Sequence, residues 1–138
     1  MKRRIKNKKH KKRAYIDELG IETPQQFSTN GKSNLRKKER MTYGFDARET
    51  YSLDSTMDML LYERLKMYLK VTDEIIDLTF YKFKYKNKIK TQEEMINILI
   101  DKLKVSLQKD IDELTPSELE YISDRWEIWS LIHRHMWW

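Results

Sequence analysis

The chain has 138 residues and a formal net charge of +6, with 36% charged and 12% aromatic residues. It carries too many large anchoring side chains for a wholly disordered chain, so part of it must fold around a core. With no cysteine and three histidines, it cannot form a disulfide framework, a thiolate zinc site or a cysteine nucleophile. Three glycines and two prolines are too few for a turn-rich sandwich or barrel, so the sequence predicts a mainly α-helical protein.

The sequence also predicts a cytoplasmic protein that holds no cofactor and no metal ion. No stretch approaches 18 apolar residues, and no apolar segment follows the basic N-terminus. We therefore expect neither a transmembrane helix nor a signal peptide. His133 and His135 would diverge by about 200° on a helix, so they cannot chelate one ion together without a bend.

Positive charge is concentrated in residues 1–40, which hold 14 Lys+Arg against 4 Asp+Glu, whereas residues 41–138 hold 14 against 18. We expect a basic, partly disordered arm with short helical turns over 1–40 and a helical domain over 41–138. A run of like charges repels itself unless a polyanion neutralises it, and the backbone of RNA or DNA is the expected polyanion. The candidate nucleic-acid-binding residues of the arm are Lys2, Arg3, Arg4, Lys6, Lys8, Lys9, Lys11, Lys12, Arg13, Arg36, Lys37, Lys38 and Arg40.

Two other interpretations of the arm remain open. It could be a solubilising tail, or it could reflect the codon composition of a lysine-rich, AT-rich genome. An anionic membrane surface is disfavoured as a partner because Ile5 is the only large apolar residue among the first 13. Within the arm, residues 14–20 predict a helical turn ended by Gly20, residues 23–27 predict a second turn, and residues 28–34 predict a linker.

The first long helix of the domain is expected to start near Ser52 and to run for about 19 residues. Its apolar residues recur at spacings of three and four, and they are Met57, Leu60, Leu61, Leu65, Tyr68 and Val71. After a turn or short helix over 72–78, bulky and charged residues alternate from Tyr81 to Lys90. This period of two predicts a strand or short β-hairpin that turns near Asn87, with Lys82, Lys84, Lys86, Lys88 and Lys90 on one face.

The lysine row is a second candidate nucleic-acid site, formed by Lys82, Lys84, Lys86 and Lys88. Lysine on a strand binds phosphate, but it also protects an edge strand from pairing with another chain, and both interpretations stay open. The interleaved aromatic side chains could stack on bases, although packing into the core is favoured.

Two capping boxes mark the starts of the last helices. Thr91 with Glu94 opens a helix whose buried face we expect to be Met95, Ile96, Leu99, Ile100, Leu103 and Leu107. Thr115 with Glu118, and proline between them, opens a final helix whose buried face we expect to be Leu119, Ile122, Trp126, Trp129 and His133. The sequence thus predicts a small domain of about three long helices with a short hairpin near 80–90.

All four tryptophans lie in the last 13 residues. Met136, Trp137 and Trp138 form a candidate protein interface, because tryptophan is enriched at interface hot spots. The partner would be another protein or a second copy of the chain. The alternative is that Trp137 and Trp138 fold back over the loop that holds Phe45 and Tyr51.

Acidic and basic side chains cluster before the first long helix, at Asp46, Arg48, Glu49 and Asp54. Paired carboxylates with an arginine could serve a nuclease or hydrolase. A loop held by local ion pairs and a cap is favoured instead, because no histidine, cysteine or phosphate-binding glycine loop is linked to the cluster by a recognised spacing. The sequence therefore favours a non-enzymatic protein.

Residues 43–68 resemble a motif of small uncharacterised phage and prophage proteins. The motif runs through Gly44-Phe45, Arg48, Thr50-Tyr51 and Leu53-Asp54 to Thr56, and it precedes an apolar helix with Arg64-Leu65-Lys66. The resemblance implies a phage origin and transfers no activity or catalytic residue. On that basis we expect an interaction protein that binds nucleic acid or a nucleoprotein, by analogy an inhibitor of host machinery such as an anti-CRISPR protein. A nuclease or hydrolase and a structural virion component are the alternatives.

Overall fold

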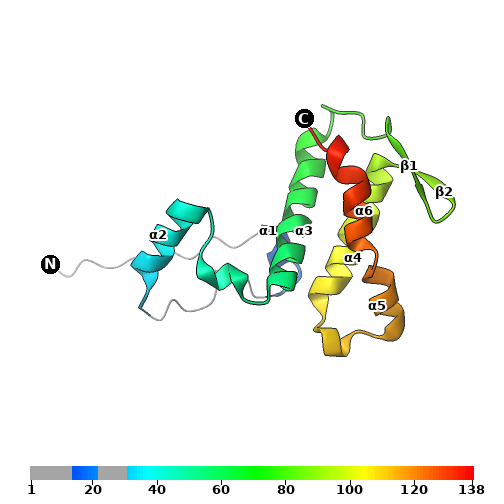
Figure 1. The fold of residues 1–138 in the computed structure, drawn as a ribbon. Helices are drawn as coiled ribbons and strands as arrows, with labels where there is room; N and C mark the ends of the chain where they lie inside the picture. The colour runs from blue at the N-terminus through cyan, green and yellow to red at the C-terminus, as the bar shows by residue number, and fades with distance from the viewer. Residues whose placement is uncertain (1–13, 22–30) are drawn as a thin grey trace.

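The structure is a computed structural model that describes residues 14–21 and 31–138. It is mainly helical with one short antiparallel hairpin (Figure 1), which confirms the predicted fold class. The predicted turn at 23–27 and the cations from Lys2 to Arg13 lie outside the described residues. The main elements are α1 (Ala14–Asp17), α2 (Ser33–Tyr43), α3 (Leu53–Thr72), β1 (Lys82–Tyr85), β2 (Lys88–Thr91), α4 (Gln92–Gln108), α5 (Pro116–Ile122) and α6 (Arg125–Ile132). Single 3-10 turns are η2 (Ala47–Thr50), η3 (Ile111–Glu113) and η4 (His133–His135).

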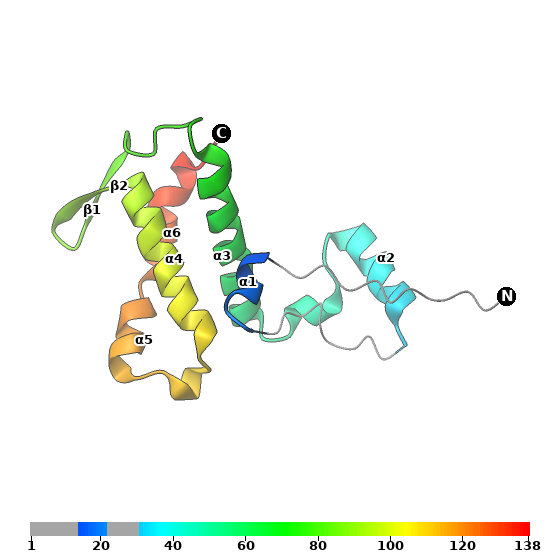
Figure 2. The same ribbon diagram turned by 180° about the vertical axis from the view of Figure 1, so that it is seen from behind.

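The core lies between α3, α4 and α6, which run side by side in Figures 1 and 2. The hairpin lies at one side of this bundle, and α2 stands apart at the other side. α1 packs against α3, and its Ile16 is fully buried in the core. Sequence reasoning assigned Ile16 to the basic arm, so the apolar core extends further toward the N-terminus than the charge pattern indicated.

α4 is the element that the sequence predicted best. Thr91 accepts a hydrogen bond from the amide of Glu94, and the Glu94 carboxylate accepts one from the amide of Thr91, which confirms the capping box. The six residues expected to face the core are all buried. The cap fixes where the helix begins, and the spacing of the apolar residues then fixes which face is buried.

α3 begins and ends close to the predicted residues, but its buried face is rotated. Met57 is exposed, whereas Met59 and Tyr62 are buried together with the predicted Leu61 and Leu65. Ser52 precedes the helix without a capping hydrogen bond from its side chain. The rotation arises because α1 and α4 both pack on α3, so more than one stripe of this helix is covered.

The predicted final helix is two helices. Its capping box at Thr115 and Glu118 is confirmed, but α5 ends at Ile122, and α6 begins at Arg125 after a turn at Ser123 and Asp124. Within α5, Ile122 is buried as expected, but Leu119 is exposed. The turn shifts the helical phase in α6, where Ile128 and Ile132 are buried, Trp129 is half-buried and the expected Trp126 is exposed, as is His133 after the helix.

The C-terminal residues lie at the end of α3 that carries Tyr68, whose hydroxyl donates to the carbonyl of Trp137 over 3.1 Å. Tyr51 lies just before the other end of α3, and the helix rises about 23 Å from Leu53 to Tyr68 at 1.5 Å per residue. The alternative in which the tryptophans fold over the loop of Phe45 and Tyr51 is therefore wrong. Trp137 and Trp138 are 60% and 70% exposed.

None of the helices in residues 14–21 and 31–138 combines the length and the apolar character that a membrane crossing needs.

Replacing Ile128 with alanine should lower the free energy of unfolding by about 2–5 kcal/mol, because it leaves a cavity in a fully packed site. Trp126→Ala should cost less, since the Trp126 side chain is 38% exposed. Chemical denaturation of both variants tests the phase of α6. A larger loss for Trp126→Ala than for Ile128→Ala would mean that α5 and α6 form one continuous helix.

Candidate nucleic-acid interface

The residues near 80–90 form the predicted β-hairpin, with a turn of two residues. β1 pairs antiparallel with β2, and Lys84 lies opposite Ile89 while Tyr85 lies opposite Lys88. Lys86 and Asn87 form the turn with φ angles of 48° and 63°. Positive φ at both central residues is the pattern of a type I′ turn, whose twist matches that of paired strands. The predicted turn near Asn87 is thus confirmed.

The aromatic side chains of the hairpin pack toward the helices. Phe83 and Tyr85 are half-buried and pack against the core, and Tyr81 stacks on His135 with ring centroids 4.3 Å apart. Gln92 makes two further hydrogen bonds to this segment. Its side-chain amide donates to the carbonyl of His135, and its main-chain amide donates to the carbonyl of Tyr81. Of the two interpretations left open for these rings, core packing is the one that the geometry supports.

A buried ion pair anchors the hairpin to α4 and to the turn before α6. The Lys102 ammonium is 1% exposed and lies 2.9 Å from one carboxylate oxygen of Asp124. The other oxygen of Asp124 accepts a hydrogen bond of 2.6 Å from the Tyr85 hydroxyl. Lys102 also donates to the carbonyl of Tyr121 and lies over the Tyr121 ring. One lysine therefore holds β1, α4 and α5 together.

The pKa values of this cluster follow from its burial. Burial raises the pKa of Tyr85 well above its usual value, and the hydrogen bond to Asp124 adds to the shift. Burial alone would raise the pKa of Asp124, but the hydrogen bonds from Tyr85 and Lys102 outweigh it and hold this pKa below its usual value. Tyr85 is thus neutral and Asp124 ionised near pH 7, so the anchor persists at physiological pH.

The alternation of residues predicted one row of lysines on one face, and this prediction is wrong. The sequence pattern treats 81–90 as one strand, but the two-residue turn reverses the chain, and directly paired residues share a face. Lys82 and Lys84 therefore lie on the outward face with Ile89, whereas Lys88 shares the inward face with Tyr85. Lys86 lies in the turn, with its ammonium 5.4 Å from the centroid of the Tyr85 ring.

The hairpin lysines are nonetheless available to a ligand. Their side chains are exposed, and no acidic side chain in the described part of the chain forms an ion pair with Lys82, Lys84, Lys86 or Lys88. Lys90 differs, because it is half-buried and lies 3.7 Å from Glu94. Residues 80–90 contain five lysines and no acidic residue, so this hairpin carries a concentrated positive charge.

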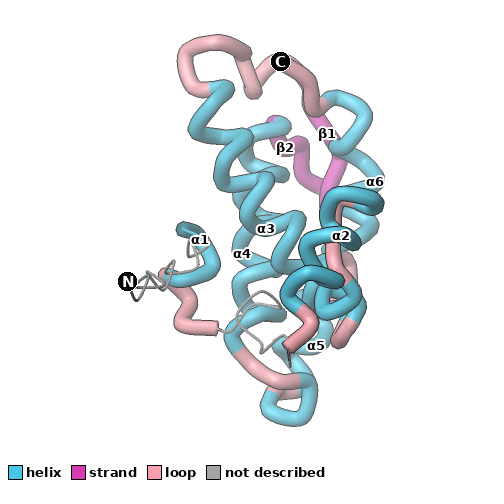
Figure 3. The backbone as a smooth tube through the Cα atoms, turned by 90° about the vertical axis from the view of Figure 1, so that its left-hand side faces the viewer, coloured by secondary structure: helices cyan, strands magenta, loops and turns pink. Residues whose placement is uncertain are grey.

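The second basic cluster lies on α2, which buries none of its residues. Two of its cations are paired, since Arg36 contacts Glu39 at 2.9 Å and Arg40 contacts Asp46 at 2.8 Å. Lys37 and Lys38 are exposed. Figures 1 and 2 place α2 and the hairpin on opposite sides of the helical bundle, and the side view in Figure 3 places α2 in front of it. The two predicted basic clusters therefore do not converge on one surface.

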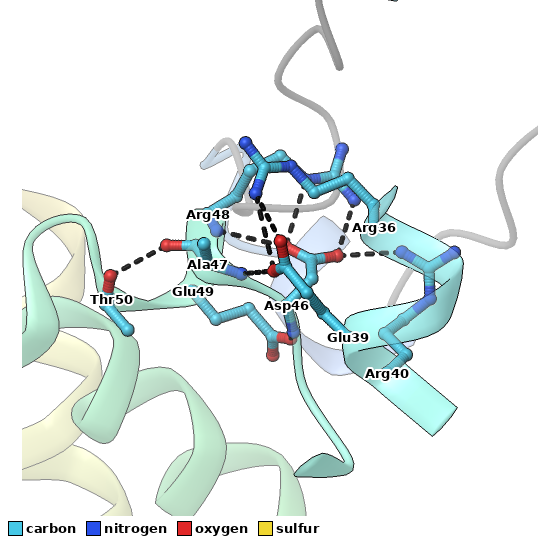
Figure 4. A network of polar contacts seen from close by, with 8 residues as sticks. All are labelled: Arg36, Glu39, Arg40, Asp46, Ala47, Arg48, Glu49 and Thr50. Atoms are coloured by element: carbon cyan, nitrogen blue, oxygen red, sulfur yellow. Dashed lines mark hydrogen bonds and ion pairs between the residues drawn. The ribbon is translucent and has the colours of Figure 1, made fainter. Parts of the chain in front are cut away.

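The acidic and basic cluster near residue 46 is a polar hub that holds α2 to η2 (Figure 4). Asp46 is 1% exposed, and its carboxylate accepts hydrogen bonds from the backbone and side chain of Arg48 and from Arg40. Glu49 completes a capping box by accepting from the amide of Asp46. Glu39 accepts from the amide of Ala47. Asp54 is exposed and lies outside this hub, in the first turn of α3.

The chemistry of the hub favours a structural role. The Arg48 guanidinium hydrogen-bonds Asp46 and lowers the pKa of that carboxyl to about 2; burial opposes the shift, and Arg40 adds to it. A general base works best with a pKa near the operating pH, so a carboxylate held this low is a weak proton acceptor. The arrangement agrees with the interpretation of a loop held by local ion pairs and a cap.

Sequence reasoning missed the buried Asp58 as well as Lys102. Asp58 of α3 is 2% exposed and accepts hydrogen bonds from Ser106 over 2.6 Å and from Arg125 over 3.1 Å. These contacts link α3, α4 and α6 beside a groove of about 710 Å³. A charged residue inside an apolar stripe, as Lys102 is between Leu99 and Leu103, is the one sequence signal that could have indicated such pairs.

No group of three or more His, Cys, Asp or Glu side chains in the described ranges is arranged to hold a metal ion. His135 packs against the hairpin, and His133 is exposed with its ring near the carbonyl of Trp129. The two imidazoles thus diverge, as their spacing predicts.

No protein-family model, curated protein or solved structure matches the chain. The resemblance of residues 43–68 to phage proteins therefore stays a prediction, and the functional argument rests on the geometry of the described residues.

Replacing Asp46 with asparagine should lower the free energy of unfolding by about 1–2 kcal/mol at pH 7. This figure follows from the fall in pKa, reduced for the solvent that screens the exposed Arg40. The lowered pKa means that the stabilisation is present above the unfolded value of 3.8 and is lost as the pH falls to about 2. Denaturation of both proteins at pH 7 and pH 2 should show the difference disappear, with the exposed Glu120→Gln as control. A difference that persisted at pH 2 would mean that the charge of Asp46 is not what stabilises the hub.

Proposed function

We propose that the protein is a small non-enzymatic binding protein that contacts the backbone of nucleic acid through its hairpin. The observation that carries the proposal is the set of exposed lysines, Lys82, Lys84, Lys86 and Lys88, on a hairpin anchored to the core. The buried Lys102 and Asp124 hold the hairpin in place, so the lysines are presented without further ordering.

Backbone contact is the mode that this surface supports best. Lysine meets phosphate as a point charge, and each contact releases condensed counterions, which gives affinity without sequence preference. The cations from Lys2 to Arg13 would add to the same attraction, as would Lys37 and Lys38 of α2 on the other side of the bundle. The protein would then bind nucleic acid, or a nucleoprotein, over an extended length.

We propose a second, protein-binding surface at the C-terminal end, formed by Met136, Trp137 and Trp138. The two indoles are exposed although the hydrogen bond from Tyr68 holds the chain end on α3. Large exposed aromatic side chains on a held chain end are typical of association surfaces. The partner would be a host or phage protein or a second copy of the chain. A role as an inhibitor of host machinery rests on the phage resemblance alone.

The hydrolytic alternative receives less support. It would need Asp46 or Glu49 as the acid or base and Arg48 as the electrophile. Asp46 is engaged by two arginines, and Glu49 caps η2, so these carboxylates perform structural work. A divalent-metal-dependent cleavage assay on RNA and DNA tests this alternative directly.

Replacing Lys82 and Lys84 together with glutamine should weaken binding to single-stranded nucleic acid and flatten its salt dependence. Loss of two phosphate contacts lowers the slope of log K against log salt by about 1.4 for a single strand. Lys70→Gln with Lys104→Gln removes the same charge from exposed positions on α3 and α4 and should leave the slope closer to that of the parent. Equal slopes for the two double variants would contradict the proposed role of the hairpin.

Deleting Trp137 and Trp138 should leave a folded protein whose thermal midpoint changes little, because both side chains are largely exposed. It should abolish self-association, or partner binding, measured by sedimentation and by affinity purification with and without nuclease. Full association by the truncated chain would exclude the C-terminal surface as an interface.

A further inference from the structure

Phe80 is a large aromatic side chain that the fold leaves in solvent. It is 73% exposed and lies in a bend two residues before β1. Tyr81 and Phe83 both contact the ring of His135, whereas Lys82 and Lys84 lie on the outward face of the hairpin, close to Phe80 in the sequence. Ile89, paired with Lys84, is also exposed there, at 66%. The hairpin and the bend before it thus present two lysines and two apolar side chains to solvent.

The position of Phe80 is fixed by its neighbours. Its amide donates to the carbonyl of Asp77, whose carboxylate accepts hydrogen bonds from the amide and hydroxyl of Thr79. Its ring meets the edge of Tyr81 with centroids 5.1 Å apart, and Tyr81 in turn stacks on His135. The Tyr81 ring is therefore packed between two others, whereas the Phe80 ring is exposed to solvent. A ring held in water beside cations has the composition of a base-stacking position.

We infer that Phe80 stacks on a base of single-stranded nucleic acid whose phosphates are bound by Lys82 and Lys84. This inference rests on the proposed function and names its ligand class. Every base has a π-face, so stacking on one ring adds affinity without selecting a sequence. Ile89 would lie beside the same or the next base as an apolar contact.

The surroundings of the hairpin favour a single strand over a duplex. Tyr85 and Phe83 hold the inward face against the helices, so a nucleic acid would approach Phe80 from the outer side of the hairpin. Within a duplex the bases are stacked on one another, and Phe80 could reach a π-face only after a base had been unstacked. An unpaired strand offers its bases without that cost.

The test measures binding of the full chain to labelled oligonucleotides by fluorescence anisotropy. The probes are oligo-dT, oligo-rU, an abasic single strand of equal length and a duplex of equal length. Of oligo-dT and oligo-rU, the strand that the parent protein binds more tightly is used for the comparison. Phe80→Ala should weaken binding to this strand by about 5-fold to 100-fold. Phe80→Trp should restore it, and Tyr43→Ala, which removes a comparably exposed ring on the α2 side, should not weaken it.

The abasic strand supplies the decisive comparison. Phe80→Ala should not change its binding, because the phosphates remain and no base is present to stack. The inference would be overturned if Phe80→Ala weakened binding to the base-containing and abasic strands equally, or weakened neither. It would also be overturned if the duplex bound more tightly than the single strand and depended equally on Phe80. The double variant Lys82→Gln, Lys84→Gln distinguishes failure of this inference from failure of the proposed function. If this variant weakens binding and Phe80→Ala does not, the inference fails and the proposed function stands. If neither variant weakens binding, the proposed function fails as well.

Discussion

The buried ammonium of Lys102 is the constraint on which the arrangement of this protein depends. A charge removed from water must be paired, and the partner here is Asp124, in the turn that separates α5 from α6. The second oxygen of Asp124 receives the hydroxyl of Tyr85, which couples the same ion pair to the hairpin. The break between the last two helices and the hairpin therefore meet at one buried ion pair.

What the sequence predicted well depends on local signals. α4 was predicted in its start, its type and its buried face, because a capping box and a regular apolar spacing act within a few residues of each other. The prediction of a single last helix failed because no proline or glycine marks the turn at Ser123 and Asp124, and the tertiary contact of Asp124 with Lys102 accompanies the turn there. Ile16 was missed for a related reason. A short apolar turn within a basic segment has no local signal that it packs on α3.

The candidate site shows the same division between local and tertiary signals. The residue types and the turn near Asn87 could be predicted, but the lysines were assigned to one face because alternation was counted across the turn. Pairing of Lys84 with Ile89 and of Tyr85 with Lys88 divides them between two faces. Phe80 was not singled out, since its exposure becomes evident only once Tyr81 and Phe83 are seen to face inward.

The two ends of the molecule use charge in opposite ways. At the Asp46 hub, cations and carboxylates satisfy one another and attach α2 to the domain with no apolar burial on that helix. On the hairpin, Lys82, Lys84, Lys86 and Lys88 form no ion pair with an acidic side chain among the described residues, and only Lys90 pairs there, with Glu94. A basic sequence can therefore be internally neutralised in one segment and available to phosphate in another, and only the placement of the acidic side chains distinguishes the two.

The central claim is that the outward face of the anchored hairpin is the surface that meets nucleic acid. Amide chemical-shift mapping of the isotopically labelled full chain, titrated with a single-stranded oligonucleotide, tests this claim most directly. The account predicts the largest shift changes at residues 80–89, with the amides of α5 and α6 nearly unchanged. Changes confined to α2 and the loop around Asp46, with the hairpin amides unaffected, would contradict it.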